Sequence, residues 1–188
     1  MSEILHIVEY VVAGAVGAGV AAFAFVFLVQ PSWAVPVLER LTPQVLYRVK
    51  TSAPLVALSF DDGPHTENTP RVFEILQRYD ARATFFLIGD RAERQPGVVA
   101  AIRAGGHEIG NHYLYYRHGF ALAHSDDEFA RHLRDVERAL GLPEGRDARP
   151  KLFRAPGGLA RASQLRRARE MGYTPALGSA YPHDPAHP

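Results

Sequence analysis

The sequence begins with one long apolar stretch and continues as short apolar runs separated by mixed segments. Residues 10–29, YVVAGAVGAGVAAFAFVFLV, contain no charged side chain. A helix of about 20 apolar residues is long enough to cross the hydrocarbon core of a bilayer. The stretch is longer than the apolar part of a typical signal peptide and no lysine or arginine precedes it, which favours a retained anchor over a cleaved signal. We therefore predict one transmembrane helix within residues 1–30.

The rest of the chain has the pattern of an α/β domain. Residues 31–50 contain three prolines and predict a linker with a short amphipathic helical piece. From residue 51 onward, apolar runs typical of strands alternate with segments that have the apolar spacing of helices. The predicted strands span residues 55–60, 83–89, 107–112, 151–156 and 174–180, and the predicted helices span residues 70–79, 97–104, 126–140 and 162–171. This alternation predicts parallel strands joined by crossover helices, in a layer or a barrel over residues 51–188.

Two of the predicted helices have clear start signals. Thr69 is the expected N-cap of the first, with Pro70 at its first helical position. Ser125 and Glu128 have the spacing of a capping box at the start of the third. Glycines at or just beyond the ends of three helices are the expected stops, at Gly105, Gly106, Gly141 and Gly172.

Composition excludes several classes of function. The 188 residues are 47% apolar and 22% charged, which is typical of a globular protein. A formal net charge of +1, without a basic stripe, gives no electrostatic case for nucleic acid. Because the chain has no cysteine, a metal ion would have to be held by histidine, aspartate or glutamate, and nine histidines are present.

Unusual polar residues follow several of the predicted strands. Asp61 and Asp62 end the apolar run PLVALSF, His112 ends GHEIGNH, and Arg154 lies in FRAPGG. The carboxyl ends of parallel strands share one edge of a sheet, where α/β folds bind their ligands. Each residue alone also fits a plainer role, namely a solvated turn, a hydrogen-bonded histidine or a surface ion pair. Their common position at strand ends favours one shared site.

The segments LSFDDGP, GHEIGNH and FRAPGG resemble, in this order, the first three motifs of the polysaccharide deacetylase family. Its members are NodB-like carbohydrate esterases that remove N- or O-acetyl groups from chitin, peptidoglycan and related glycans. The resemblance covers residues 54–184 and implies a distorted (β/α) barrel with a metal ion at its mouth. It also implies a hydrolase of carbon–nitrogen bonds that uses a divalent ion, expected to be Zn²⁺.

The resemblance assigns a role to each matched residue. Asp61 corresponds to the catalytic base and Asp62 to a metal ligand, which would explain why both are present. His112 corresponds to the first metal histidine, and Arg154 to the arginine that holds the base.

Two further roles follow from the same resemblance. The backbone N–H near Gly157 corresponds to the group that stabilises the oxyanion. Asp184 lies near a later motif in which an aspartate orients the histidine that acts as general acid, although the usual tryptophan after it is missing.

Other positions depart from the family pattern. Tyr116 stands where the second metal histidine belongs, and His118 follows two residues later. His118 can replace that ligand if the segment is a loop; otherwise Tyr116, water or nothing completes the site. Tyr116 is also a candidate for stacking on a sugar ring. The chain ends before the family's last motif, so we expect an incomplete barrel.

Three functions remain open at this stage. The first is a membrane-anchored deacetylase that acts on an acetylated envelope or chitin-like glycan, with its domain outside the cytoplasm. The second is a degenerate or truncated relative that binds glycan without turnover. The third is a cytosolic hydrolase of another C–N bond, which the basic residues after the apolar stretch favour through the positive-inside rule.

Overall fold

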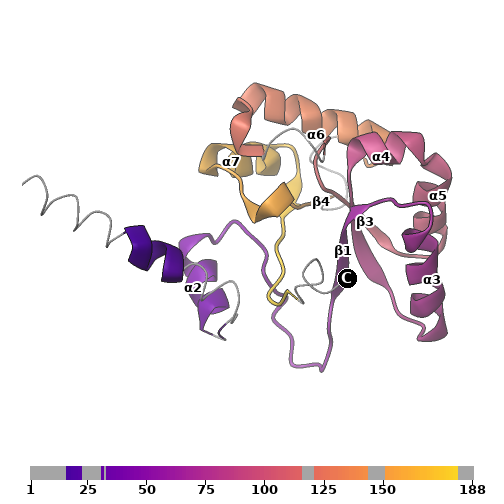
Figure 1. The fold of residues 1–188 in the computed structure, drawn as a ribbon, viewed down its shortest axis with the longest axis horizontal. Coiled ribbons are helices and arrows are strands. Elements are labelled where there is room, and N and C mark those ends of the chain that lie inside the picture. The colour runs from indigo at the N-terminus through magenta and orange to yellow at the C-terminus, as the bar shows by residue number, and fades with distance from the viewer. Residues whose placement is uncertain (1–15, 23–30, 32, 116–120, 144–150, 182–188) are drawn as a thin grey trace, which may run out of the picture. The chain divides into compact units, whose positions relative to one another are not determined.

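The structure is a computed structural model that describes residues 16–22, 31, 33–115, 121–143 and 151–181 (Figure 1). The chain divides into two compact units, one of Met1–Pro43 with Ser179–Pro188 and one of Gln44–Gly178. In the first unit, residues 16–22 are helical, and α2 spans Ala34–Leu41. The helical piece predicted within residues 31–50 is therefore present. None of the described helices has the length and apolarity needed to span a membrane, and most of the predicted anchor lies outside the described residues.

The second unit contains a five-stranded parallel sheet in the order β1-β2-β3-β4-β5. The strands are β1 (Leu58–Gly63), β2 (Ala83–Leu87), β3 (Glu108–Asn111), β4 (Lys151–Phe153) and β5 (Tyr173–Pro175). The connecting helices are α3 (Asn68–Arg78), α4 (Gly89–Arg94), α5 (Pro96–Ala104), α6 (Asp126–Leu140) and α7 (Ala162–Glu170). Short 3₁₀ turns lie at Ala121–Ala123 and Pro156–Gly158.

The predicted α/β class is confirmed, because every strand pair is parallel and crossover helices join the strands. Figure 1 shows the helices of this unit, α3 to α7, in an arc along one side of the strands. In the described part of the chain, β1 and β5 are the edges of the sheet, so the sheet does not close into a barrel there. Leu46 lies beside the β5 edge, where its N–H donates to the Pro175 carbonyl at 2.8 Å and its carbonyl accepts from Leu177 N–H at 2.8 Å.

The core has two parts. One lies under α3, α4 and α5, where Phe85 stacks on Phe60 with ring centroids 5.3 Å apart and meets the edge of Phe73 at 5.4 Å. The other lies under α6 and α7 and is built around Phe129, Phe153 and other buried side chains. Apolar residues of neighbouring strands and helices therefore meet in the way that the hydrophobic pattern predicts.

The start of the domain differs from the prediction. The expected strand over residues 55–60 ends before the aspartates, whereas β1 begins at Leu58 and continues through Asp61 and Asp62 to Gly63. Leu55 and Val56 are exposed, by 75% and 85%. These two residues come just before β1, which lies at the edge of the sheet and has a neighbouring strand on one side only. An apolar run is buried only where another element covers it.

Helix capping was predicted correctly at one helix and wrongly at another. In α6, the Ser125 hydroxyl accepts from Glu128 N–H and the Glu128 carboxylate accepts from Ser125 N–H, so the capping box is confirmed. α3 begins at Asn68, and Thr69 is not its N-cap. The Thr69 hydroxyl instead accepts from the backbone N–H of His65 at 2.9 Å, which ties down the loop before the helix.

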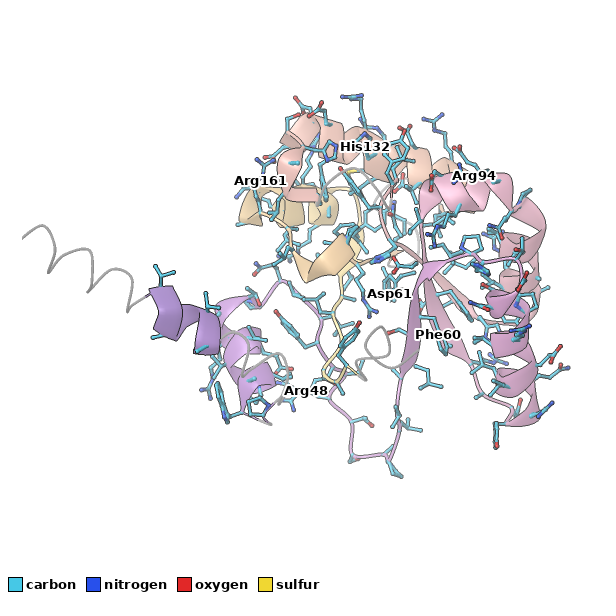
Figure 2. All side chains as sticks on the ribbon, viewed as in Figure 1. Arg48, Phe60, Asp61, Arg94, His132 and Arg161 are labelled. Carbon is cyan, nitrogen blue, oxygen red and sulfur yellow. The ribbon has the colours of Figure 1, made fainter. Side chains whose placement is uncertain are left out.

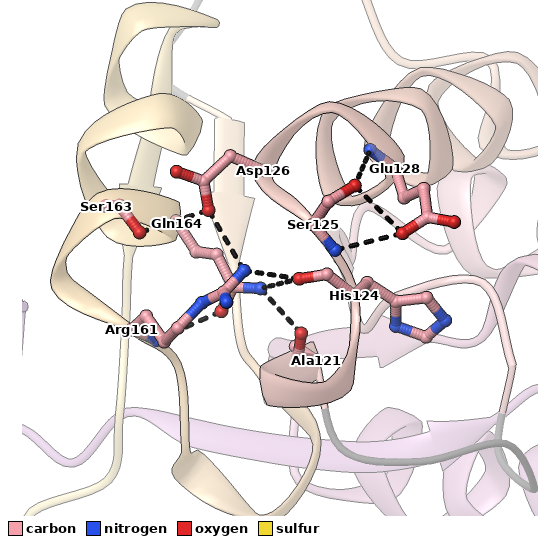
Figure 3. Close-up of polar contacts among 8 residues, drawn as sticks. All are labelled: Ala121, His124, Ser125, Asp126, Glu128, Arg161, Ser163 and Gln164. Carbon is pink, nitrogen blue, oxygen red and sulfur yellow. Dashed lines mark hydrogen bonds and ion pairs between the residues drawn. The ribbon is translucent and has the colours of Figure 1, made fainter.

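Polar contacts join α6 to α7 (Figure 3). The buried Gln164 side chain donates to the carbonyls of Ala121 at 2.6 Å and His124 at 3.1 Å. Asp126, in the first turn of α6, accepts from Arg161 at 3.1 Å and from the Ser163 hydroxyl at 3.0 Å. These bonds position the segment that leads into α6, because buried carbonyls need such partners.

Candidate active site at the carboxyl ends of the strands

Four of the predicted site residues meet at one end of the sheet. Asp61 and Asp62 lie near the end of β1, His112 directly follows β3, and Arg154 directly follows β4. Arg154 Nη1 lies 2.7 Å from Asp61 Oδ1, and His112 Nε2 lies 3.3 Å from Asp62 Oδ1. His112 Nδ1 lies 2.9 Å from the Arg154 carbonyl, so the two pairs form one continuous network. The strand ends therefore converge as the sequence predicted.

The backbone at Asp62 explains how two neighbouring aspartates reach the same site. On a regular strand their side chains would point to opposite faces. Asp62 instead has φ of 65°, and the pairing of β1 with β2 shifts register between Phe60 and Gly63. This left-handed residue breaks the alternation, so Asp61 faces Arg154 while Asp62 faces His112. The carbonyl of Asp62 accepts a hydrogen bond from Arg91 in α4.

Arg154 is held on several sides. Besides Asp61, it donates to the Ser59 hydroxyl at 2.9 Å and to the Ala176 carbonyl at 3.2 Å. Its guanidinium lies over the ring of Phe86, 3.9 Å from the centroid. The side chain is only 12% exposed. Arg154 therefore presents a fixed cation to the Asp61 carboxylate, and the sequence pattern predicted none of these three additional contacts.

His112 has the geometry of a metal ligand. A carbonyl accepts hydrogen bonds, so the contact with Arg154 O requires a proton on Nδ1 and leaves Nε2 facing Asp62. A second-shell carbonyl of this kind commonly orients a metal-binding histidine. Bonds of ~2.0–2.1 Å to one tetrahedral Zn²⁺ ion place two ligand atoms about 3.3–3.4 Å apart. The 3.3 Å between His112 Nε2 and Asp62 Oδ1 fits this requirement.

Other predicted site residues fall outside this network or outside the description. Gly157 lies in the turn after β4 with φ of 64°, a conformation that favours glycine. Tyr116, His118 and Asp184 lie outside the described residues. Among the residues that are described, no three His, Asp or Glu side chains gather closely enough to hold a metal ion. A metal ion at this place would have His112 and Asp62 as two ligands and would need a third from outside the described residues.

Sequence reasoning missed Asn111, the buried residue just before His112. Its side-chain carbonyl accepts from Tyr113 N–H at 2.8 Å, and its amide donates to the Tyr173 hydroxyl at 2.8 Å and to the Leu133 carbonyl at 3.3 Å. Tyr113 has φ of 75°, so the chain turns sharply around His112. Asn111 fixes this turn, and burial raises the pKa of Tyr173 well above its usual range.

A second polar cluster begins at Tyr113, the residue after His112, and includes His132 and His124. The Tyr113 hydroxyl lies 2.8 Å from His132 Nδ1, and the ring of His132 meets the ring of His124 at 4.8 Å between centroids. Burial raises the pKa of Tyr113 and lowers the pKa of His132. The charged and titratable groups that act on His132 are His124, Arg131, Asp135 and Glu128.

From the lowered pKa of His132 we predict that the protein loses stability in mild acid. Unfolded His132 takes up a proton near pH 6.5, whereas folded His132 takes it up only at lower pH. Between these two pKa values the unfolded state binds more protons, so the free energy of unfolding falls as pH falls below about 6.5. Urea unfolding at several pH values between 7.5 and 5 measures this slope. His132→Gln should reduce the slope, and an equal slope in both proteins would contradict the prediction.

Comparison with known proteins agrees with the geometry. The family model for polysaccharide deacetylase matches residues 48–176. Peptidoglycan-N-acetylglucosamine deacetylase from Bacillus cereus is 37% identical over 149 residues, which are 78% of this chain and 68% of that protein. Chitooligosaccharide deacetylase from Sinorhizobium fredii is 34% identical over 143 residues, which are 75% of this chain and 64% of that protein.

Solved structures give the same result. A peptidoglycan N-acetylglucosamine deacetylase in complex with 4-naphthalen-1-yl-N-oxidanyl-benzamide superposes with a TM-score of 0.63 at 32% identity, covering 74% of this chain and 63% of that one. A CE4 family pseudoenzyme from Bacillus anthracis superposes with a TM-score of 0.62 at 27% identity, covering 74% of this chain and 48% of that one. This chain therefore spans about half to two thirds of the length of these relatives. By its family match, its relatives and its fold, the chain belongs to the polysaccharide deacetylase family.

Proposed function

We propose that this protein is a metal-dependent hydrolase that removes acetyl groups from an N-acetylated glycan, such as peptidoglycan or a chitin-like oligosaccharide. The single observation that carries the proposal is the joined pair of contacts, Asp61 with Arg154 and Asp62 with His112, in one network at the strand ends. Relatives named as peptidoglycan and chitooligosaccharide deacetylases support the class of substrate.

The two aspartates have different tasks in this proposal. Asp61 keeps one oxygen on Arg154, and its side chain is 35% exposed, so its other oxygen can accept a proton from the attacking water. Asp62 and His112 would hold a divalent ion, and Zn²⁺ suits a site of nitrogen and oxygen ligands. When bound, the ion would supply polarisation of the acetyl carbonyl and a water whose pKa is lowered to about 7. A relative that binds an N-oxidanyl amide supports this part of the proposal, because the carbonyl and hydroxyl oxygens of such a group, on neighbouring carbon and nitrogen atoms, can chelate a metal.

The remaining assignments complete the site. We propose that His118 is the third metal ligand, with Tyr116 or water as the alternative, and that the backbone N–H near Gly157 stabilises the oxyanion. Tyr116 would then be available to stack on a sugar ring. Asp184 is proposed to orient the general acid.

The first test is the metal content of the purified full-length chain, measured by mass spectrometry. We expect about one ion per chain in the wild type and loss of the ion in His112→Ala, because removing one of few ligands weakens binding steeply. Loss in His118→Ala would identify the third ligand, and Arg94→Ala serves as a surface control. A folded wild type without metal would overturn the proposal and favour the alternative of glycan binding without turnover. One protein of similar fold is named a CE4 family pseudoenzyme.

We also propose that residues 1–30 anchor the protein in a membrane. The domain would then lie outside the cytoplasm, on the side of the membrane where envelope glycans are found. The apolar length of residues 10–29 supports the anchor. The basic residues Arg40, Arg48 and Lys50 favour the opposite orientation. A C-terminal alkaline phosphatase fusion distinguishes the two, because this reporter is active only outside the cytoplasm, and an inactive but stable fusion would refute the proposed orientation.

A further inference from the structure

Helix α4 connects the two loops of the site. Its first two backbone N–H groups, of Gly89 and Asp90, donate to the carbonyls of Tyr113 at 3.0 Å and Leu114 at 3.1 Å. These carbonyls belong to the two residues that follow His112. The beginning of α4 is therefore bonded to the loop that carries the proposed metal histidine.

The same segment also binds the loop of the aspartates. The Arg91 side chain donates to the Asp62 carbonyl, Ile88 N–H donates to the Gly63 carbonyl at 2.8 Å, and the Gln95 amide donates to the Pro64 carbonyl at 3.3 Å. Three consecutive carbonyls thus find their partners within residues 88–95. This arrangement leaves little freedom for the backbone that carries Asp62.

Asp62 needs such support because of its conformation. A φ of 65° is uncommon for a residue other than glycine and persists only where surrounding contacts fix it. The same conformation turns the Asp62 carboxylate toward His112. Contacts that hold the left-handed turn therefore also hold the distance between the two proposed ligand atoms.

Helix α4 is a rigid support for these contacts. A Cβ atom added at Gly89 would lie 2.7 Å from Val136 Cγ2 and 3.0 Å from Leu114 Cδ1, so the start of α4 packs directly against α6 and the His112 loop. The half-buried Arg91 reaches Asp62 from this fixed helix. A guanidinium at the end of a long side chain can bridge such a gap with a directed hydrogen bond.

We infer that Arg91 is a positioning residue of the site, which holds the left-handed backbone at Asp62 and thereby sets the spacing of Asp62 and His112 for a shared metal ion. The inference rests on the proposed function, because the spacing has this meaning only if a metal binds there. Arg91 contacts neither substrate nor metal in this role. It acts through the backbone of a ligand.

The test compares Arg91→Met with Arg94→Met in the full-length chain. Arg94 is matched to Arg91 in residue type and helix, but its side chain is 67% exposed and pairs with Asp90 one turn earlier. In Figure 2 it lies well away from Asp61. We expect Arg91→Met to weaken the affinity for Zn²⁺ by ~10–100-fold, as is typical when a second-shell partner is removed. Arg94→Met should leave the affinity unchanged. Competition with a chromophoric chelator measures both affinities.

Two further measurements separate positioning from folding. Arg91→Lys should recover part of the lost affinity, because lysine keeps a donor near the Asp62 carbonyl. Hydrogen exchange of the metal-free proteins should show faster exchange at the amides within residues 61–65, of which Pro64 has none, in Arg91→Met and elsewhere the wild-type pattern. Wild-type affinity in Arg91→Met, or an equal loss in Arg94→Met, would overturn the inference.

A wild type that binds no metal would refute the proposed function rather than the contact itself. In that case the hydrogen-exchange experiment alone tests whether Arg91 holds the backbone at Asp62. Faster exchange confined to residues 61–65 in Arg91→Met supports this role. Unchanged exchange there overturns it.

Discussion

Asp61→Asn is expected to lower the rate of glycan deacetylation by a factor of ~10²–10⁴, the usual contribution of a general base, and to leave metal binding intact. Asparagine has the same shape and keeps an oxygen that can accept the hydrogen bond from Arg154, so the network around the guanidinium should persist. What asparagine loses is the ability to accept a proton from water. The loss should therefore appear in kcat rather than in KM.

The measurement is acetate release from N-acetylated oligosaccharides, with metal content determined on the same samples. Ser59→Ala is the matched control, because it removes a different hydrogen bond of the same arginine, at 2.9 Å, without touching a carboxylate. We expect Ser59→Ala to lower the rate by less than about tenfold, in line with the net ~0.5–1.5 kcal/mol of one such bond. An Asp61→Asn variant as active as Ser59→Ala would show that another group is the base.

Asn111→Leu is expected to have the largest effect on stability. Leucine has a similar volume but removes the partner of the buried Tyr113 N–H and two further buried hydrogen bonds, to the Tyr173 hydroxyl and to the Leu133 carbonyl. Those last two groups keep only their long mutual contact of 3.5 Å. A buried polar group left unsatisfied costs ~1–3 kcal/mol, and each of the two other lost bonds contributes ~0.5–1.5 kcal/mol. The total is a large part of the ~5–15 kcal/mol that stabilises a typical domain. Because Asn111 is fully buried, water cannot replace the lost bonds.

Denaturant unfolding of Asn111→Leu and Tyr173→Phe measures this effect. Tyr173→Phe removes only the hydroxyl and leaves the bond between Asn111 and Tyr113 N–H in place, so it should cost clearly less. The comparison isolates the bond that fixes the turn around His112. Equal losses in the two variants would show that the turn does not depend on Asn111.

The convergence of the site was predictable because it depends on topology. Alternating strands and helices make the sheet parallel, and the carboxyl ends of parallel strands share an edge, so residues as distant as Asp61, His112 and Arg154 come together. The capping box at Ser125 was predictable for a different reason, because its two residues lie three positions apart and need no tertiary contact.

Other features could not be read from the pattern. Asp62 adopts a left-handed conformation that aspartate rarely prefers, and the contacts that hold it come from residues about 30 positions away. Helix α4 has six residues and begins at a glycine, which is too short for an apolar period to be visible. Asn111 gives no local signal, because its partners Leu133 and Tyr173 lie on α6 and β5. Each of these depends on long-range packing rather than on local preference.

The contact between Leu46 and the β5 edge determines how far the chain can be truncated from its N-terminal side without exposing β5. The apolar pattern places the start of the domain at residue 51, and a shortened chain designed on that basis would lack Leu46. The Pro175 carbonyl and the Leu177 N–H would then lose their partners, and β5 would present an open edge to other molecules. A shortened chain that starts at Gln44 keeps this short piece of sheet and should therefore stay monomeric where one starting at residue 51 aggregates.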